Sequence, residues 1–237
     1  MKILSGKNAM VLGGSRGIGA AVVERLVNEG AQTIFTYSHS SEIAKQLSER
    51  VGAKAIQVDS ADRDATTAAI QAQGPLDILV VVAGVFIMGD PLEINVDEID
   101  HMIDVNVRSP YFACVEAARK MNEGGRIVLI GSVNGDRMPM AGATAYALSK
   151  SAIQGLVRGL ARDLGPRNIT VNNVQPGPVD TQMNPGDGPM SEFMHSFMAI
   201  KRHARTEEIA GLVAYLLGPE AGMVTGAQHT IDGGFGA

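Results

Sequence analysis

The chain has 237 residues, of which 45% are hydrophobic and 19% charged, enough apolar material to fill a large core and typical of one α/β domain. A net charge of −5, a pI near 5.5 and no run of lysine or arginine argue against a nucleic-acid-binding protein. The single cysteine, Cys114, excludes an internal disulfide, is typical of a reducing compartment and lies in an apolar segment where we expect it to pack.

The amino-terminal segment, MKILSGKNAMVLGG, carries neither a signal-peptide cleavage pattern nor an apolar stretch long enough to cross a membrane. We therefore expect a cytoplasmic protein with neither a membrane nor a nucleic acid as its partner.

Short apolar runs alternate with longer amphipathic segments along the whole chain. Runs of four or five apolar residues are what a sheet buried on both faces requires, and helices between them predict right-handed crossovers. The predicted strands are Asn8–Leu12, Thr33–Thr36, Ala55–Val58, Ile78–Val82, Arg126–Ile130, Thr170–Val174 and Gln228–Ile231. The predicted helices include Ile18–Glu29, Glu42–Arg50, Arg63–Gln71, Tyr146–Leu164 and one that starts near Thr206. This pattern predicts a three-layer, doubly wound Rossmann fold with a seven-stranded parallel sheet, in a single domain over residues 1–237.

The least regular region is Pro176–His203, which is rich in Pro, Gly, Asn and Met and follows a predicted strand. A long segment at the carboxyl end of a strand predicts a substrate lid, at about residues 180–205; the alternative is a mobile surface loop. Met194 and Met198 would give the lid an adaptable apolar wall. His195 lies between them and either belongs to an amphipathic lid helix or contacts the substrate.

A glycine cluster, GGSRGIG from Gly13 to Gly19, joins the first strand to the first helix. The glycines allow a tight turn, and they let backbone N–H groups and the helix N-terminus approach a pyrophosphate. The position of the cluster between strand and helix predicts a dinucleotide-binding loop.

The second strand ends in Thr36–Ser40 (TYSHS), where a site for NAD(H) would place an acidic residue to hold the ribose hydroxyls. No acid is present there, and Arg16 in the glycine cluster would offer a cation to a 2′-phosphate. We therefore expect NADP(H) rather than NAD(H). Alternatively, Arg16 is a solvated loop residue, and His39 is either a further phosphate contact or merely exposed.

Tyr146 and Lys150 lie four residues apart in a strongly helical stretch, which places both side chains on one helical face. A free tyrosine has a pKa near ~10, and a nearby ammonium would lower this pKa toward the working pH of a proton donor. Ser132 follows the apolar strand RIVLIGS, at the sheet edge where open α/β sheets bind their ligands. The three residues together predict a carbonyl-reducing site.

The motifs together resemble the short-chain dehydrogenase/reductase family over essentially the whole chain. The segments that carry the resemblance are the glycine cluster, Asp59 after the third strand, Asn106 in DVNVRSP, Ser132, Tyr146-x-x-x-Lys150 and Pro176-Gly177.

This resemblance implies that Tyr146 donates the proton, Ser132 orients the substrate carbonyl, and Lys150 binds the nicotinamide ribose. Asn106 would hold a water in the proton relay, and hydride would pass between nicotinamide C4 and the carbonyl carbon. The expected cofactor-binding residues are Gly13, Ser15, Arg16, Gly17, Ile18, Gly19, Tyr37, Ser38, Asp59, Ser60, Ala83, Gly84, Tyr146, Lys150, Pro176, Gly177, Val179 and Thr181. The family also implies a homotetramer or homodimer, with the segment HTIDGGFGA near a subunit interface.

The chain departs from the family pattern at two places. Leu12 stands where the family has threonine, and Val81-Val82 stands where it has Asn-Asn. The usual side-chain hydrogen bonds cannot form there, although an apolar pair can pack in a buried strand. We expect cofactor binding to survive with altered affinity or geometry. The long interval between Ser132 and Tyr146 is expected to reshape the substrate pocket.

Three segments, GSVNGDRMP, VQPGPVDT and MAIKRH, are similar to a bacterial subgroup of the family that includes a cyclic-di-GMP-binding regulator of biofilm dispersal. This resemblance implies an alternative function: an NADPH- and cyclic-di-GMP-binding regulator that promotes dispersal with little or no turnover. The arginine pair Arg158 and Arg162 either contributes to such a site or serves subunit packing and surface solvation. A basic cluster near the lid either attracts a phosphorylated ligand or is solvated, and it consists of Lys201, Arg202, His203 and Arg205.

The five histidines form no close pair and no recognisable ligand motif along the chain. We therefore expect no metal site.

Overall fold

The computed structural model describes residues 2–237 and contains a parallel sheet of seven strands in the order β3-β2-β1-β4-β5-β6-β7. The strands are β1 (Asn8–Leu12), β2 (Gln32–Tyr37), β3 (Lys54–Gln57), β4 (Ile78–Val81), β5 (Arg126–Ile130), β6 (Thr170–Pro176) and β7 (Gln228–Ile231). The predicted fold class and all seven predicted strands are confirmed. The differences lie at strand ends: β3 is displaced by one residue, and β6 runs on to Pro176 because it pairs with Ile231 there.

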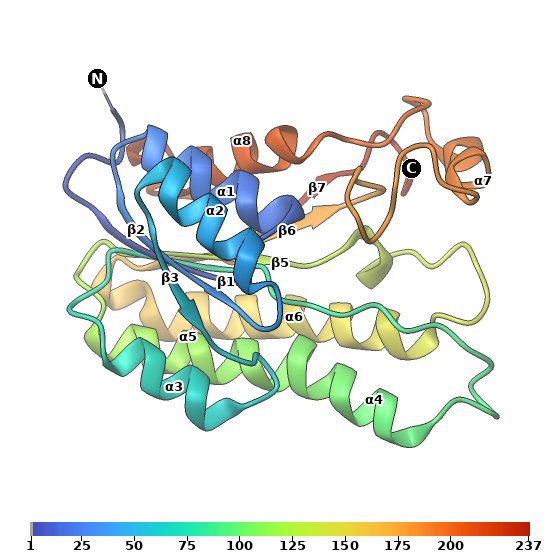
Figure 1. The fold of residues 1–237 in the computed structure, drawn as a ribbon, viewed down its shortest axis with the longest axis horizontal. Coiled ribbons are helices and arrows are strands. Elements are labelled where there is room, and N and C mark those ends of the chain that lie inside the picture. Colours follow the sequence, from blue (N-terminus) through green and yellow to red (C-terminus); the bar gives the residue numbers. More distant parts are fainter. Residues whose placement is uncertain (1) are drawn as a thin grey trace.

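Helices cover both faces of this sheet (Figure 1). Helices α1, α2 and α8 lie on one face, and α3, α5 and α6 lie on the other. Their bounds are α1 (Gly17–Asn28), α2 (Ser41–Val51), α3 (Arg63–Gln71), α4 (Val96–Ile103), α5 (Ser109–Lys120), α6 (Thr144–Leu164), α7 (Ser191–Phe197) and α8 (Thr206–Leu217). Helices α4 and α5 lie outside the ranges predicted from sequence, and a π-helical turn over Asp104–Arg108 connects them.

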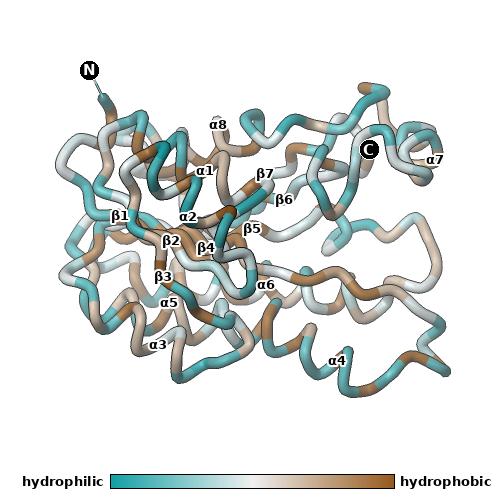
Figure 2. Tube along the Cα trace, in the orientation of Figure 1, coloured by the Kyte–Doolittle hydropathy of each residue, from teal (hydrophilic) through white to brown (hydrophobic). Residues whose placement is uncertain are grey.

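The core lies in two apolar layers, one on each side of the sheet, and the strands at the centre of Figure 2 are correspondingly hydrophobic. Successive residues of β1 alternate between the layers, with Val11 in one and Met10 in the other, as the period of a strand requires. Cys114 is fully buried in the second layer, which confirms its predicted packing role. Burial raises the pKa of its thiol to about 12. Among residues 2–237, no helix is both long and apolar enough to span a bilayer.

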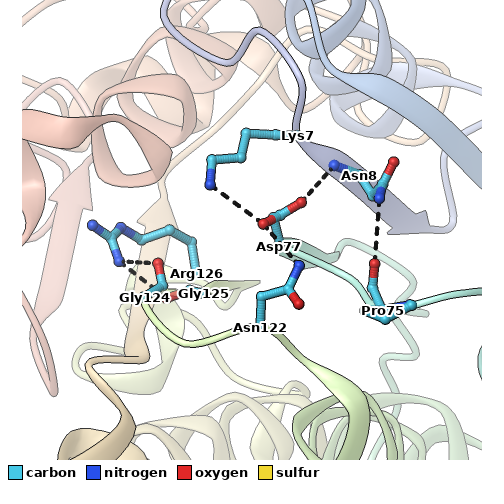
Figure 3. Close-up of polar contacts among 8 residues, drawn as sticks. All are labelled: Lys7, Asn8, Pro75, Asp77, Asn122, Gly124, Gly125 and Arg126. Carbon is cyan, nitrogen blue, oxygen red and sulfur yellow. Dashed lines mark hydrogen bonds and ion pairs between the residues drawn. The ribbon is translucent and has the colours of Figure 1, made fainter.

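A polar network closes the amino-terminal edge of the sheet (Figure 3). The Asp77 carboxylate accepts hydrogen bonds from the N–H of Asn8 at 2.9 Å, from Lys7 at 3.3 Å and from Asn122 at 3.1 Å. Burial opposes ionisation of Asp77, but these three donors outweigh it and lower the pKa of the carboxyl. The network joins the starts of β1 and β4, so the polar side chains at this edge stabilise the sheet.

The opposite edge, at the carboxyl ends of the strands, contains the point where the strand order reverses: β2 and β3 are added on one side of β1, and β4 to β7 on the other. Strand β1 pairs with both β2 and β4, so the crossovers leave it on opposite sides. Such a switch point opens a crevice at the carboxyl ends of the strands, and ligands of open α/β sheets bind there.

Two helical glycines give a matched test of how tightly this edge is packed. A Cβ at Gly19 in α1 would lie 2.0 Å from the Gly13 carbonyl oxygen, whereas one at Gly211 in α8 would meet no atom within 4 Å. We predict that Gly19→Ala lowers the free energy of unfolding by about 1–3 kcal/mol or more, because backbone must move. Gly211→Ala should raise it by roughly 0.5–1 kcal/mol. Urea denaturation of both variants measures this, and equal effects would contradict the packing described.

Candidate functional site

A cleft of about 530 Å³ runs along the carboxyl edge of the sheet. Its volume is in the range of roughly 300–1,000 Å³ that is usual for small-molecule sites. The structure brings every cofactor residue expected from the sequence to this one cleft, together with Ser132. Asn106, which is 1% exposed, lies behind the cleft wall instead.

The turn between β1 and α1 is shaped by its glycines. Gly13 has φ +81°, and a Cβ there would lie 2.7 Å from the Ala83 nitrogen, so only glycine lets the turn touch the end of β4. Arg16 is the N-cap of α1 but makes no side-chain cap, and the first turn of the helix carries no acid. The N–H groups at this helix start are therefore available to an anionic ligand in the cleft.

Thr36 at the end of β2 anchors the glycine turn. Its hydroxyl accepts a hydrogen bond from the N–H of Gly13 at 3.0 Å, and its carbonyl accepts one from Gly14 at 2.8 Å. The next residues of β2 lead into the cleft wall, where the Ser38 hydroxyl and His39 Nδ1 lie 2.8 Å apart. The polar, acid-free end of β2 thus faces the cleft that Arg16 also lines.

The two departures from the family pattern are accommodated by packing and by backbone bonds. Leu12 and Val81 are register partners in β1 and β4, and each is 3% exposed. The Leu12 carbonyl accepts hydrogen bonds from the N–H groups of Val82 at 2.9 Å and Ala83 at 3.0 Å. The backbone therefore joins the two strand ends without polar side chains.

Asn106 clamps the loop after β4 to helix α6. Its amide oxygen accepts from the N–H of Val85 at 2.9 Å, and its amide nitrogen donates to the Val85 carbonyl at 2.9 Å. The same nitrogen donates to the Ser149 hydroxyl at 3.1 Å, and that hydroxyl donates to the Tyr146 carbonyl at 2.7 Å. Because both amide donors are used inside the protein, this side chain holds the site together and has no N–H to offer a relay water.

Ser132, Tyr146 and Lys150 all line this cleft. Tyr146 and Lys150 project from the first turns of α6, as predicted, and the Lys150 ammonium lies 5.8 Å from the Tyr146 ring centroid. Lys150 also donates to the Ile130 carbonyl at 3.2 Å. The Phe86 ring stands edge-on to the Tyr146 ring, with centroids 4.6 Å apart at 89°.

The pKa values of this group are controlled by burial. Burial raises the pKa of Tyr146, and a hydrogen bond with Ser132 only partly offsets the rise. The lowering that we expected from the Lys150 ammonium is therefore wrong in sign, since desolvation of the phenolate dominates. Burial also lowers the pKa of Lys150 to about 8.

The segment after β6 lines part of the cleft and leads into α7. Thr181, Met183 and Met194 line the cleft, whereas Met198 is buried against Val133 and Phe235 instead. One of the two methionines expected in the lid wall therefore faces the cleft.

The histidines correct one expectation from the sequence. His195 and His203 form a close pair, with Nε2 of the first 2.7 Å from Nδ1 of the second. Eight residues separate them along the chain, and the fold of the lid brings them together. Within residues 2–237, no group of three or more His, Cys, Asp or Glu side chains gathers as metal ligands.

The basic residues near the lid have partners within the protein. Arg202 forms two hydrogen bonds with the Glu208 carboxylate, at 2.7 and 2.8 Å, and Lys201 donates to the Ser196 carbonyl at 3.2 Å. His203 is 5% exposed. In the described chain, the residues that line the cleft include none of the four members of this cluster.

Sequence reasoning missed several lining residues. Phe86 and His101 lie between the fourth strand and Asn106, in a stretch without a regular apolar pattern. Phe235 lies far along the chain, and only the tertiary fold brings it to the cleft. The position of Phe86 two residues after Gly84 was the one available clue.

Comparison with known proteins agrees with this geometry. A family profile described as enoyl-(acyl carrier protein) reductase matches residues 13–236. The chain belongs to the short-chain dehydrogenase/reductase family. It is 60% identical, over the full length of both chains, to the cyclic-di-GMP-binding biofilm dispersal mediator protein of Escherichia coli (strain K12).

Two solved structures superpose closely on the chain. BdcA in complex with NADPH has a TM-score of 0.98 and 60% identity, over 99% of this chain and 96% of that one. A short-chain dehydrogenase/reductase from Serratia marcescens BCRC 10948 has a TM-score of 0.96 and 54% identity, over 99% of this chain and 100% of that one.

Proposed function

We propose that the protein is an NADP(H)-dependent oxidoreductase that reduces a carbonyl group, with Tyr146 as the proton donor. The observation that carries this proposal is that Ser132, Tyr146 and Lys150 line the same cleft as the glycine turn. A dinucleotide seated on that turn would extend along the cleft toward the three side chains. The sequence motifs and the geometry thus support one reaction centre.

The cleft fits NADP(H) on three counts. The uncapped start of α1 offers N–H groups to a pyrophosphate, and the glycines leave room for its close approach. Arg16, Ser38 and the acid-free end of β2 suit a 2′-phosphate. A relative that is 60% identical was crystallised with NADPH. Bound NADPH would supply the hydride.

Four residues of the chain orient the substrate, transfer the proton and hold the site in place. Ser132 donates a hydrogen bond to the substrate carbonyl oxygen and orients it toward Tyr146. Tyr146 gives its phenolic proton to that oxygen as the carbonyl carbon becomes a carbinol carbon, so the product is an alcohol. The ammonium of Lys150 binds the nicotinamide ribose and stabilises the phenolate that is left. Asn106 fixes the position of the loop after β4 relative to helix α6 through its hydrogen bonds.

The proposal includes the architecture around this site. Residues 1–237 form a single domain, and the segment at about 180–205 acts as a substrate lid. The protein is cytoplasmic, and two or four copies assemble into a homodimer or homotetramer.

A second candidate is a regulator that binds NADPH and cyclic-di-GMP and promotes biofilm dispersal with little or no turnover. Its support is the full-length, 60% identity to a protein that is named for cyclic-di-GMP binding and biofilm dispersal. Arg158 and Arg162 are exposed on α6 and face outside the cleft lining, so they add no contact to the main site. The intact set of Ser132, Tyr146 and Lys150 favours the enzyme.

The proton-donor role is tested by Tyr146→Phe, with Tyr215→Phe on the exposed face of α8 as the matched control. We predict that Tyr146→Phe lowers kcat by about 100- to 10,000-fold, the usual contribution of a general acid, and leaves NADPH affinity nearly unchanged. Steady-state NADPH oxidation and nucleotide fluorescence titration measure the two quantities. A fully active Tyr146→Phe enzyme would show that another group supplies the proton.

Cofactor choice is tested by Arg16→Ala, with Arg158→Ala as the control. Removing one charge-assisted contact to the 2′-phosphate should weaken NADPH binding by roughly 10- to 100-fold and leave NADH binding unaffected. Equal weakening of both nucleotides, measured by fluorescence titration, would place Arg16 on a shared part of the cofactor.

The regulatory candidate predicts heat of binding when cyclic-di-GMP is titrated into the protein, with and without NADPH. Calorimetry at ligand concentrations far above the expected Kd shows whether the protein binds cyclic-di-GMP. Absence of heat in both titrations would remove this candidate, whereas saturable heat together with no turnover on any carbonyl compound would support it over the enzyme.

A further inference from the structure

The charged side chains of the cleft are confined to its cofactor-binding parts. Among the residues described as lining the cleft, the fixed charges are those of Arg16, Asp59 and Lys150. Arg16 belongs to the glycine turn and Asp59 follows β3, while Lys150 is 6% exposed and bonded to the Ile130 carbonyl. Two imidazoles also line the cleft: His39 lies in the bend after β2, and His101 lies on α4.

Six apolar side chains from separate segments line the cleft together with Ser132 and Tyr146, and we call them the substrate wall. Its members are Phe86, Val133, Met140, Met183, Met194 and Phe235. Uncharged polar side chains, among them Asn134 and Gln182, complete the lining. A ligand group that meets this wall finds no side chain of opposite charge within it.

The substrate wall contains one open aromatic ring, Phe86, and one packed ring, Phe235. Phe86 is 40% exposed and holds the Tyr146 ring by an edge-to-face contact, so its remaining surface is open beside the reacting group. Phe235 is 3% exposed and packs against Val133 and Met198, with its ring centroid 6.0 Å from that of Phe197. The open ring of Phe86 favours a flat apolar partner, since aromatic pairs gain energy beyond the burial of their area.

Methionines form the adaptable part of the wall. Met183 is 61% exposed at the lid, and Met140 and Met194 are partly buried. Flexible, polarisable side chains of this type accommodate rings of different outline. They offer no compensation to an anion, and a charge that loses water without a partner is strongly disfavoured.

The cationic side chains nearest to the lid supply no counter-charge to the substrate wall. Arg202 is neutralised by Glu208, and Lys201 is bonded to the Ser196 carbonyl. Neither side chain lines the cleft in the described part of the chain. A carboxylate or phosphate on the substrate would therefore enter the cleft without a counter-ion from the lid.

We propose that the group that enters the cleft is an uncharged, ring-bearing ketone or aldehyde without a carboxylate or phosphate. Its ring lies against Phe86 and the methionines, and its carbonyl oxygen meets Ser132 and Tyr146. This inference rests on the proposed reductase function. The step adds a hydride from NADPH to the carbonyl carbon and the Tyr146 proton to the oxygen, which gives an uncharged alcohol and NADP⁺.

The test compares three aryl ketones that separate charge from size. Propiophenone is the parent, 4-propionylbenzoate adds a carboxylate, and methyl 4-propionylbenzoate is larger still but neutral. We predict that kcat/KM for the neutral ester exceeds that for the carboxylate by about 100-fold, because the anion is desolvated without a partner. Initial rates of NADPH oxidation measure this ratio.

A charge introduced into the wall should change the ratio. Met183→Arg places a cation at the lid face of the cleft, while Met223→Arg adds the same charge at a 94% exposed position outside the cleft lining. We predict that Met183→Arg lowers the ester-to-carboxylate ratio by roughly five- to tenfold, since solvent partly screens the new charge. Met223→Arg should leave the ratio unchanged.

The outcomes separate this inference from the function on which it rests. Equal kcat/KM for ester and carboxylate, with Tyr146→Phe inactive, would overturn the substrate class and leave the reductase standing. If none of the three ketones is reduced, quenching of NADPH fluorescence in the protein–NADPH complex decides. Tighter binding of the ester than of the carboxylate would support the uncharged class, whereas equal binding or no binding would overturn it.

Discussion

No side chain fits between the end of β1, the start of α1 and the end of β4, and the rest of the site depends on that contact. Gly13 touches the backbone of Ala83, and Gly19 touches the carbonyl of Gly13, at distances that leave no room for a methyl group. Because these backbones meet, the start of α1 lies with its free N–H groups at the crevice between β1 and β4, where the strand order reverses.

A second set of contacts brings the reacting groups to the same crevice. Helix α6 carries Tyr146 and Lys150, and Asn106 ties that helix to the loop after β4 through Ser149 and Val85. The cofactor-binding turn and the proton donor are therefore linked through β4 and the loop that follows it. Burial of Tyr146 and Lys150 raises the pKa of the phenol and lowers that of the amine, so both groups are disfavoured in their charged forms.

The sequence predicted the parts of the molecule that local pattern controls. Seven apolar runs became the seven strands, and the glycine turn, Ser132, Tyr146 and Lys150 lie on one cleft as expected. Contacts between residues far apart in the sequence could not be predicted from the hydrophobic periodicity. The pairing of His195 with His203 depends on how the lid folds back, and Phe235 reaches the cleft only through tertiary packing. The sign of the Tyr146 pKa shift was wrong because spacing along a helix reveals a neighbouring charge but not the extent of burial.

The central claim is that this cleft transfers a hydride to a carbonyl carbon while a side chain of α6 protonates the oxygen. The most direct measurement follows deuterium from NADPH labelled at nicotinamide C4 into the product of a neutral aryl ketone, by mass spectrometry and NMR. The account predicts deuterium at the carbinol carbon with one handedness of the alcohol, carried from one face of the nicotinamide. An alcohol without deuterium at that carbon, or no bound NADPH at all, would contradict it.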